Sequence, residues 1–157
     1  MAGSFVAADR RFRAGNDEGS GSCALCAVVH RNDLLVCNAG DCRAVVGGRH
    51  RGARQLTRDH NPGDPDEEER IKAQGGKVVF QRRAQEAGCF GGTERVGVSR
   101  VVPGNLAVSR AIGDARIKAM HARPLVVAEP ETYRYELSRE DAFLVLATDG
   151  VWGPGGG

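Results

Sequence analysis

The stretch DLLVCNAGDCRAVVGG, residues 33–48, decides the fold class. Its two apolar runs, 33–39 and 43–48, are rich in β-formers and flank a Gly-Asp turn, as adjacent strands do. Immediately upstream, CALCAVV at 23–29 has the same character, and the turn-like HRND lies between them. The close spacing of these runs predicts three strands in an antiparallel meander.

C-terminal to this stretch, the cap residues of the sequence predict one helix. Asp64 suits its N-cap, Pro65 its first position and Gly75 its end, so a helix is predicted over 65–74. Acidic residues at 66–69 complement the positive end of its dipole.

Further strands are predicted at 77–80 and 142–148, and an irregular connection follows the first of these. Strands that outnumber helices without strict alternation predict an α+β layered fold.

Bulk composition limits the classes of function. A chain of 157 residues with 41% apolar and 27% charged residues has the size of one soluble domain. Its net charge of +2 argues against nucleic acid or an anionic membrane as partner, and the basic clusters at 10–13 and 49–54 are interpreted as solvated loops. No apolar run approaches a membrane span and no signal peptide is evident, so an intracellular location, cytoplasmic or nuclear, is expected.

The five cysteines admit two interpretations. Cys23, Cys26 and Cys37 lie in apolar runs, where a reduced thiol behaves as a small hydrophobic group. The alternative is a zinc site formed by these three with Cys42. Residues three apart in a strand point to opposite faces, which disfavours zinc.

Three aspartates share a local setting that suits a hard cation. Asp41, Asp114 and Asp149 each lie beside a glycine, and Asp41 and Asp149 follow strand-like runs. Carboxylates at strand ends can bind Mg²⁺ or Mn²⁺, although Gly-Asp pairs are also common turn formers. No nucleophile elbow, P-loop or dinucleotide fingerprint is present.

Seven segments resemble, in order, the motifs of the metal-dependent type 2C protein serine/threonine phosphatases. The resemblance is to the plant members of this family in particular. They span residues 19–152 and read GSGSCALCAVV, LLVCNAGDCRAVV, LTRDHNP, EEERIKAQGGKV, GNLAVSRAIGDARIK, VVAEPE and FLVLATDGVW. The resemblance implies a partial β-sandwich flanked by helices. It also implies hydrolysis of phosphoserine and phosphothreonine in phosphoproteins by water held between two Mg²⁺ or Mn²⁺ ions.

The resemblance assigns roles residue by residue. Asp149 matches an aspartate that binds one of the paired metals, and Asp41 matches an aspartate of an additional, weaker metal position. Asp114 matches a motif residue without an assigned catalytic role. The positions that match structural residues are Arg43, Ser109 and Arg110.

Several motifs of the family have no match in this sequence. They are an early arginine and Glu-Asp pair, an Asp-Gly-His-Gly-Gly segment and a final Gly-x-Asp-Asn, and Gly153 stands where an aspartate usually follows the tryptophan. Residues 1–157 are therefore interpreted as a single incomplete domain, lacking N- and C-terminal elements and carrying no catalytic residue. Two divalent cations repel unless several carboxylates surround them, so no activity is expected of the chain alone. The alternatives are a phosphoprotein-binding module and half of a phosphatase completed by another segment.

Overall fold

The computed structural model describes residues 2–15, 19–82 and 97–152. The helices are α1 (Ala2–Ala14), α2 (Pro65–Ala73), α3 (Ala115–Ala119) and α4 (Asp149–Trp152). The strands are β1 (Gly21–Ser22), β2 (Ala24–His30), β3 (Asp33–Ala39), β4 (Arg43–Gly48), β5 (Ala53–Gln55), β6 (Lys77–Arg82), β7 (Gly97–Val102), β8 (Ile112–Gly113), β9 (Glu131–Glu136) and β10 (Asp141–Ala147).

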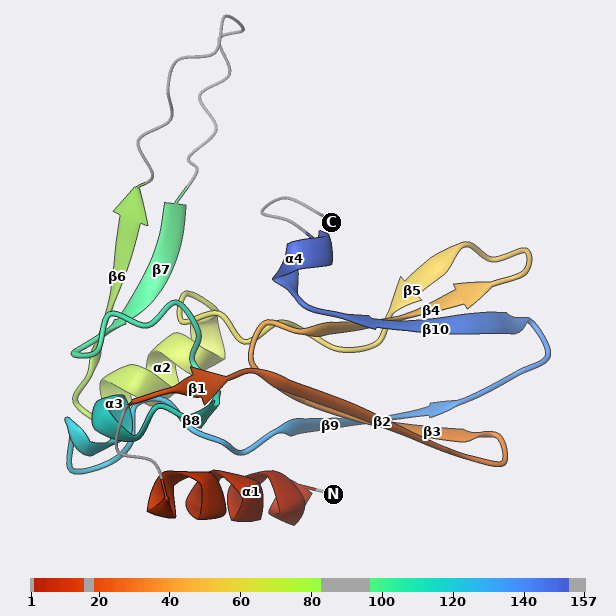
Figure 1. Ribbon diagram of the computed structural model, residues 1–157. Coiled ribbons are helices and arrows are strands. Elements are labelled where there is room, and N and C mark those ends of the chain that lie inside the picture. The colour runs from red at the N-terminus through yellow and green to blue at the C-terminus, as the bar shows by residue number, and fades with distance from the viewer. Residues whose placement is uncertain (1, 16–18, 83–96, 153–157) are drawn as a thin grey trace, which may run out of the picture.

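Two three-stranded antiparallel sheets form the sandwich. One has the order β2-β3-β9 and the other β10-β4-β5, and Figure 1 shows them extending side by side away from the helical end of the molecule. Their facing side chains form one core, in which Leu34 and Val36 of the first sheet pack with Ala44 and Leu144 of the second. The expected α+β fold, a partial β-sandwich with flanking helices, is confirmed.

Strand β3 is buried on both faces. Leu34 and Val36 point into the sandwich, whereas Cys37 and Ala39 pack with Phe5 of α1. The two sets alternate because successive side chains of a strand point to opposite faces. This explains why 33–39 is a nearly continuous apolar run.

The predicted meander is wrong in one respect. β2 and β3 do form an antiparallel pair, but β4 pairs with β10 and β5 in the other sheet. The chain changes sheets at Gly40, whose φ of +119° lies in a region that side chains disfavour. Closeness in sequence therefore did not mean pairing, because the Gly-Asp turn carries the chain across the sandwich.

Helix α2 has the predicted bounds to within one residue at its end. Gly75, with φ of +88°, ends it, and Ile71 anchors it in a second core with Val101 and Leu125. Asp64 occupies the N-cap without a side-chain cap bond, because its carboxylate accepts from the Asn61 amide instead.

The predicted strand at 77–80 extends to Arg82 as β6 and pairs antiparallel with β7. The irregular connection predicted after 77–80 includes residue 97, which the structure places in β7 as its first residue. Residues 83–96 of that connection lie outside the described residues.

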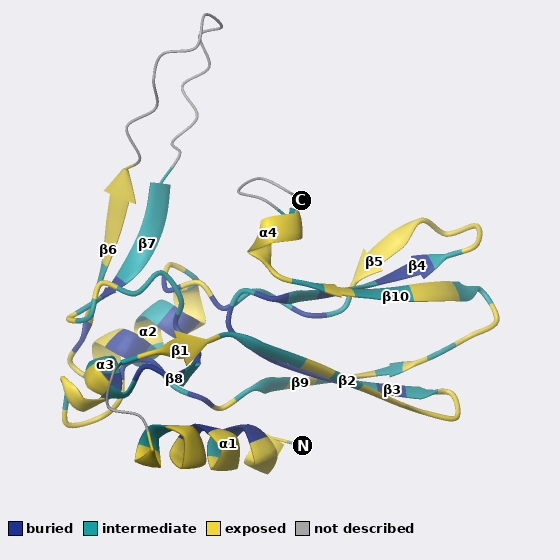
Figure 2. Ribbon diagram, in the orientation of Figure 1, coloured by how far each residue is buried: buried dark blue, intermediate teal, exposed yellow. Residues whose placement is uncertain are grey.

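Helix α1 was not predicted, and it includes the basic cluster at 10–13 that was interpreted as a loop. Asp9 fixes it to the body of the protein, because its carboxylate accepts from Lys118 Nζ at 2.6 Å and from the Gly113 amide at 2.8 Å. Figure 2 shows the exposed outer face of this helix. Among the described helices, none is long and apolar enough to cross a membrane.

Candidate metal centre

One antiparallel strand pair, β4 with β10, positions both Asp41 and Asp149. Ala147, near the end of β10, is in register with Arg43, the first residue of β4. Asp41 precedes Arg43 by two residues and Asp149 follows Ala147 by two, so both aspartates lie beyond the same end of this pair. The structure thus brings together two motifs that are far apart in the sequence.

The electrostatic environment of the Cys42 thiol indicates that the aspartates lie near one another. A hydrogen bond from Cys23 lowers the pKa of Cys42, and burial together with the negative charges of Asp41, Asp149 and Asp59 opposes that effect. All three carboxylates are therefore near enough to act on one sulfur atom.

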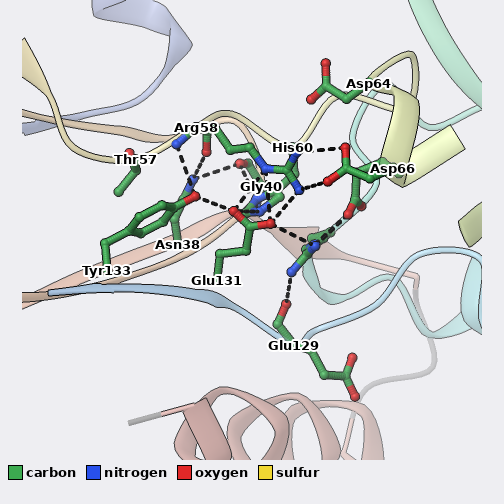
Figure 3. Close-up of polar contacts among 12 residues, drawn as sticks. Asn38, Gly40, Thr57, Arg58, His60, Asp64, Asp66, Glu129, Glu131 and Tyr133 are labelled. Carbon is green, nitrogen blue, oxygen red and sulfur yellow. Dashed lines mark hydrogen bonds and ion pairs between the residues drawn. The ribbon is translucent and has the colours of Figure 1, made fainter. Parts of the chain in front are cut away.

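The loop that carries Asp41 is held by a buried amide (Figure 3). Asn38 is fully buried, and its Nδ2 donates to the carbonyl oxygens of Gly40 and Arg58 at 3.1 and 2.9 Å. It also donates to the Cys42 carbonyl oxygen at 2.8 Å. One side chain thus joins both sides of the turn to the chain that precedes α2.

His60 supports the same turn from inside. The ring is fully buried, and its Nδ1 lies 3.1 Å from the Gly40 amide nitrogen, which donates to it. Burial and the nearby Arg110 cation lower the pKa of His60. Nδ1 also lies 3.1 Å from the Gly40 carbonyl oxygen, and Nε2 faces the Glu131 carboxylate at 3.5 Å.

Replacement of Asn38 by alanine is expected to lower the free energy of unfolding by about 3 kcal/mol, because buried carbonyl groups lose their donor. Urea denaturation measures the change. Asn61→Ala is the matched control, since Asn61 is exposed, and it should stay within about 0.5 kcal/mol of wild type. Equal effects of the two replacements would contradict the role given to Asn38.

Asp149 begins the short helix α4 and is exposed. Two contacts fix the turn that carries it. The Trp152 indole nitrogen donates to the Ala147 carbonyl at 3.0 Å, and the Arg43 guanidinium lies over the Trp152 ring at 5.6 Å from its centroid. The lone tryptophan of the sequence therefore folds back on the end of β10.

Asp59 is a third carboxylate of this region, and the sequence reasoning did not single it out. Both of its oxygens accept from Arg43, at 3.2 Å from Nε and 2.9 Å from Nη2. A fork of this kind engages both carboxylate oxygens, so Asp59 orients Arg43. The signal that could have found it is its place in LTRDHNP, directly before His60.

Asp41 and Asp149 have the donor chemistry that Mg²⁺ and Mn²⁺ prefer, and both retain solvent exposure. They account for only part of a coordination sphere. Within 2–15, 19–82 and 97–152, no group of three or more His, Cys, Asp or Glu side chains has a metal-binding arrangement. The four-cysteine zinc alternative is not formed, and Cys23, Cys26, Cys37 and Cys42 are free thiols.

Ion pairs centred on the buried Glu67 and on Glu131 join the motifs that do not carry Asp41 or Asp149. Glu67 is 2% exposed and accepts from Arg70 at 2.8 Å and from Arg110. Arg110 also lies 3.4 Å from Glu131, which pairs with Arg58 (Figure 3). The segments around 58–60, 67–70, 109–110 and 129–131 thus form one framework.

Asp114, the third aspartate singled out from the sequence, lies apart from Asp41 and Asp149. It precedes α3 in a left-handed conformation with φ of 52°, and its amide donates to the Ser20 carbonyl at 2.7 Å. Its carboxylate lies against Gly21, where an added Cβ would be 2.1 Å from Oδ2. Burial raises its pKa. The residue joins β1 to α3.

A cavity of about 530 Å³ lies between α1, α2 and the segment at 124–129, away from Asp41 and Asp149. Four of its five lining cations form ion pairs: Lys118 and Arg13 pair with Asp9, and Arg70 and Arg110 pair with Glu67, whereas Arg10 is the fifth. These pairs offset part of the positive charge of the lining.

Sequence comparisons identify the relatives of this chain. The family model described as Protein phosphatase 2C matches residues 2–153. Probable protein phosphatase 2C 14 of Arabidopsis thaliana is 43% identical over 150 residues, which are 94% of this chain and 28% of that protein. Probable protein phosphatase 2C 25 of the same plant is 41% identical over 94% of this chain and 32% of its own length.

Solved structures share the fold of this chain. A sex-determining protein of C. elegans superposes with a TM-score of 0.73 and 27% identity, over 96% of this chain and 33% of its own. The serine-threonine phosphatase 2C of Toxoplasma gondii, with a TM-score of 0.69 and 23% identity, shares the fold over 94% of this chain and 48% of its own.

The fold and the motifs agree with the family that the family model gives. The chain belongs to the protein phosphatase 2C family. It spans about a third of the length of the curated relatives that it matches.

Proposed function

We propose that this chain supplies one part of a Mg²⁺ or Mn²⁺ centre of the protein phosphatase 2C type, with Asp149 and Asp41 as its ligands. The observation that carries the proposal is the register of β4 and β10, which brings both aspartates to one end of a strand pair. The plant relatives support the phosphatase character of the whole protein.

Residues 1–157 alone do not hydrolyse phosphoproteins in this proposal. Two divalent cations a few Å apart repel strongly, and the charge of several carboxylates must offset this repulsion. Asp41 and Asp149 provide two, while Asp59 is engaged by Arg43. We therefore assign to the purified chain a single weak metal position that Asp41 and Asp149 share, in place of the two separate positions that the resemblance implies, and no binuclear site.

The test is Mn²⁺ binding by isothermal titration calorimetry. The chain is expected to bind one Mn²⁺ weakly, and Asp149→Asn and Asp41→Asn should each reduce the affinity at least tenfold, which is about 1.4 kcal/mol. Asp33→Asn is the matched control, because Asp33 is a half-buried carboxylate at the start of β3 that pairs with Arg134. Unchanged binding in both site variants would refute the ligand assignment.

Activity is measured separately, with a phosphothreonine peptide and Mn²⁺. No turnover above the level of Asp149→Asn is expected from residues 1–157. Turnover by the wild-type chain that Asp149→Asn abolishes would overturn the proposed inactivity and leave the ligand assignment intact.

A second candidate is half of a phosphatase that another polypeptide segment completes. It is supported by the apolar surface at β10 and α4, where Phe143, Leu146 and Val151 are 60%, 44% and 68% exposed. Among the described strands, β10 ends its sheet and pairs only with β4. A polypeptide carrying the family's Asp-Gly-His-Gly-Gly segment and final aspartate should then restore Mn²⁺-dependent turnover, and its failure to do so would dismiss this candidate.

A further inference from the structure

One side of helix α1 lines the cavity between α1, α2 and the segment at 124–129. The α1 residues in the lining are Val6, Asp9, Arg10 and Arg13. Their spacing of i, i+3, i+4 and i+7 places them on the same side of a helix. Two arginines of the basic cluster at 10–13 therefore belong to a cavity wall, whereas Arg11 of the same cluster is exposed outside the lining.

The opposite wall is held in place by two other arginines. Arg70 of α2 donates to the Leu125 carbonyl at 2.9 Å, and Arg110 donates to the Glu129 carbonyl at 3.1 Å. The segment at 124–129 is thus fixed near both of its ends. The apolar residues of the lining are Val6, Pro124, Val126, Val127 and Ala128. The cavity therefore combines a basic wall with an apolar one.

Positive charge exceeds negative charge in this cavity. The lining cations are Arg10, Arg13, Arg70, Arg110 and Lys118. Asp9 and Glu129 are the carboxylates of the lining, and Glu67, behind it, pairs with two of the cations. Glu131 lies 3.4 Å from one of them but pairs more closely with Arg58. Five cations against three carboxylates leave two positive charges without an offset, and this excess attracts an anion.

Some hydrogen-bonding groups of the lining have no partner. Among the described residues, Arg10 forms no ion pair and no side-chain hydrogen bond. Within the same part of the chain, buried polar atoms without a hydrogen-bond partner include Arg13 Nε, Arg70 Nε and Gln74 Oε1. Buried polar atoms are nearly always satisfied by protein, water or a ligand. The lining therefore has hydrogen-bonding capacity left for a ligand.

We propose that this cavity binds a small phosphate monoester, with Arg10 and Arg13 holding the phosphate group and the apolar residues at 124–128 contacting the organic part. The site is independent of the metal ligands, because the cavity lies away from Asp41 and Asp149. Its volume of about 530 Å³ is within the range of about 300–1,000 Å³ that small-ligand sites have.

The charge and the shape of the ligand follow from the two walls. A phosphate monoester carries a charge of about −1.5 to −2 at neutral pH, which matches the excess charge of the cavity. Guanidinium groups donate in pairs to phosphate oxygens, and a phosphate has enough oxygens to accept from both α1 arginines at once. An apolar body attached to the phosphate removes the opposite wall from water, which inorganic phosphate does not do.

The test is titration of the metal-free, isotope-labelled chain with phenyl phosphate, followed by NMR of the amide signals at constant ionic strength. Metal-free protein excludes binding of the phosphate through a cation at Asp41 and Asp149. Inorganic phosphate and benzyl alcohol are titrated in parallel, because they separate the charged part of the probe from its apolar part.

Phenyl phosphate should shift the signals of 70–74 and 124–129 together with those of α1, and it should bind at least about fivefold more tightly than inorganic phosphate. No binding, or shifts confined to α1, would overturn the proposal. Equal affinity for inorganic phosphate would overturn the role of the apolar wall, and equal affinity for benzyl alcohol would overturn recognition of the phosphate.

Two arginine variants then locate the phosphate. Arg10→Gln should weaken binding about tenfold, the effect of losing a hydrogen bond to a charged group. Because Arg10 has no internal partner among the described residues, urea denaturation should show the stability of wild type. Arg11→Gln is the matched control, since it removes the same charge from the same helix outside the lining, and its affinity should stay within about twofold of wild type. Unchanged binding by Arg10→Gln, or equal weakening by both variants, would overturn the site.

Discussion

Replacing Glu67 with alanine is expected to lower the free energy of unfolding by about 3–5 kcal/mol, the usual cost of breaking a buried ion pair from one side. Glu67 is 2% exposed and accepts from both Arg70 and Arg110. Its loss removes the carboxylate that Arg70 and Arg110 share, and it leaves Arg110 with the more distant Glu131 at 3.4 Å. Arg70 and Arg110 also donate to the carbonyls of Leu125 and Glu129, so the whole framework around α2 loosens.

The pH dependence of stability provides an independent check. Burial by itself would raise the pKa of Glu67, but the hydrogen bonds from Arg110 and Arg70 outweigh it and bring the pKa from 4.5 to about 2. A carboxylate with a depressed pKa stabilises the fold above its unfolded value and loses that effect as the pH falls toward its folded value. The stability difference between wild type and Glu67→Gln should therefore shrink between about pH 4.5 and pH 2.

Glu69→Gln is the matched control for both measurements, because Glu69 is an exposed acid of the same helix. It should change stability by less than about 0.5 kcal/mol. A Glu67→Ala loss no larger than that of Glu69→Gln in urea denaturation would contradict the framework.

Replacing Asp9 with alanine is expected to destabilise the protein by about 2–4 kcal/mol, since it removes the acceptor of a buried ammonium group and of the Gly113 amide. Lys118 is 3% exposed, and burial already lowers its pKa although Asp9 favours the charged form. Without Asp9 the ammonium group loses its counter-charge. Hydrogen exchange should then accelerate throughout Ala2–Ala14, because Asp9 holds α1 against β8.

A double replacement separates the ion pair from simple loss of packing. Asp9→Ala combined with Lys118→Met removes both charges and fills the site with an apolar chain, so it should recover part of the stability lost in Asp9→Ala. A double variant as unstable as the single one would show that the pair is not the source of the effect.

Much of the fold could be predicted from local sequence. The runs at 33–39 and 43–48 are strands with the predicted bounds, and the Pro65 and Gly75 signals mark the two ends of α2. Which sheet each strand joins could not be predicted, because that depends on Gly40 and the bonds of Asn38. Helix α1 was missed since it is fixed by a tertiary contact, Asp9 with Lys118.

The candidate site was predictable only in part. A glycine beside an aspartate at a strand end identified Asp41 and Asp149, and the register of β4 with β10 brings them to the same end. The same signal also selected Asp114, which lies elsewhere. The supporting contacts of Asn38, His60 and Asp59 join segments distant in sequence, and no local pattern carries that information.

The most direct test of the account is Mn²⁺ titration of the isotope-labelled chain, followed by NMR. Paramagnetic Mn²⁺ broadens the amide signals of residues close to it. If Asp41 and Asp149 share one metal position, signals at 40–42 and 148–150 should broaden together at the same Mn²⁺ concentration, and Asp149→Asn should weaken both effects. Broadening of one segment without the other, or broadening that Asp149→Asn leaves unchanged, would contradict a shared metal position.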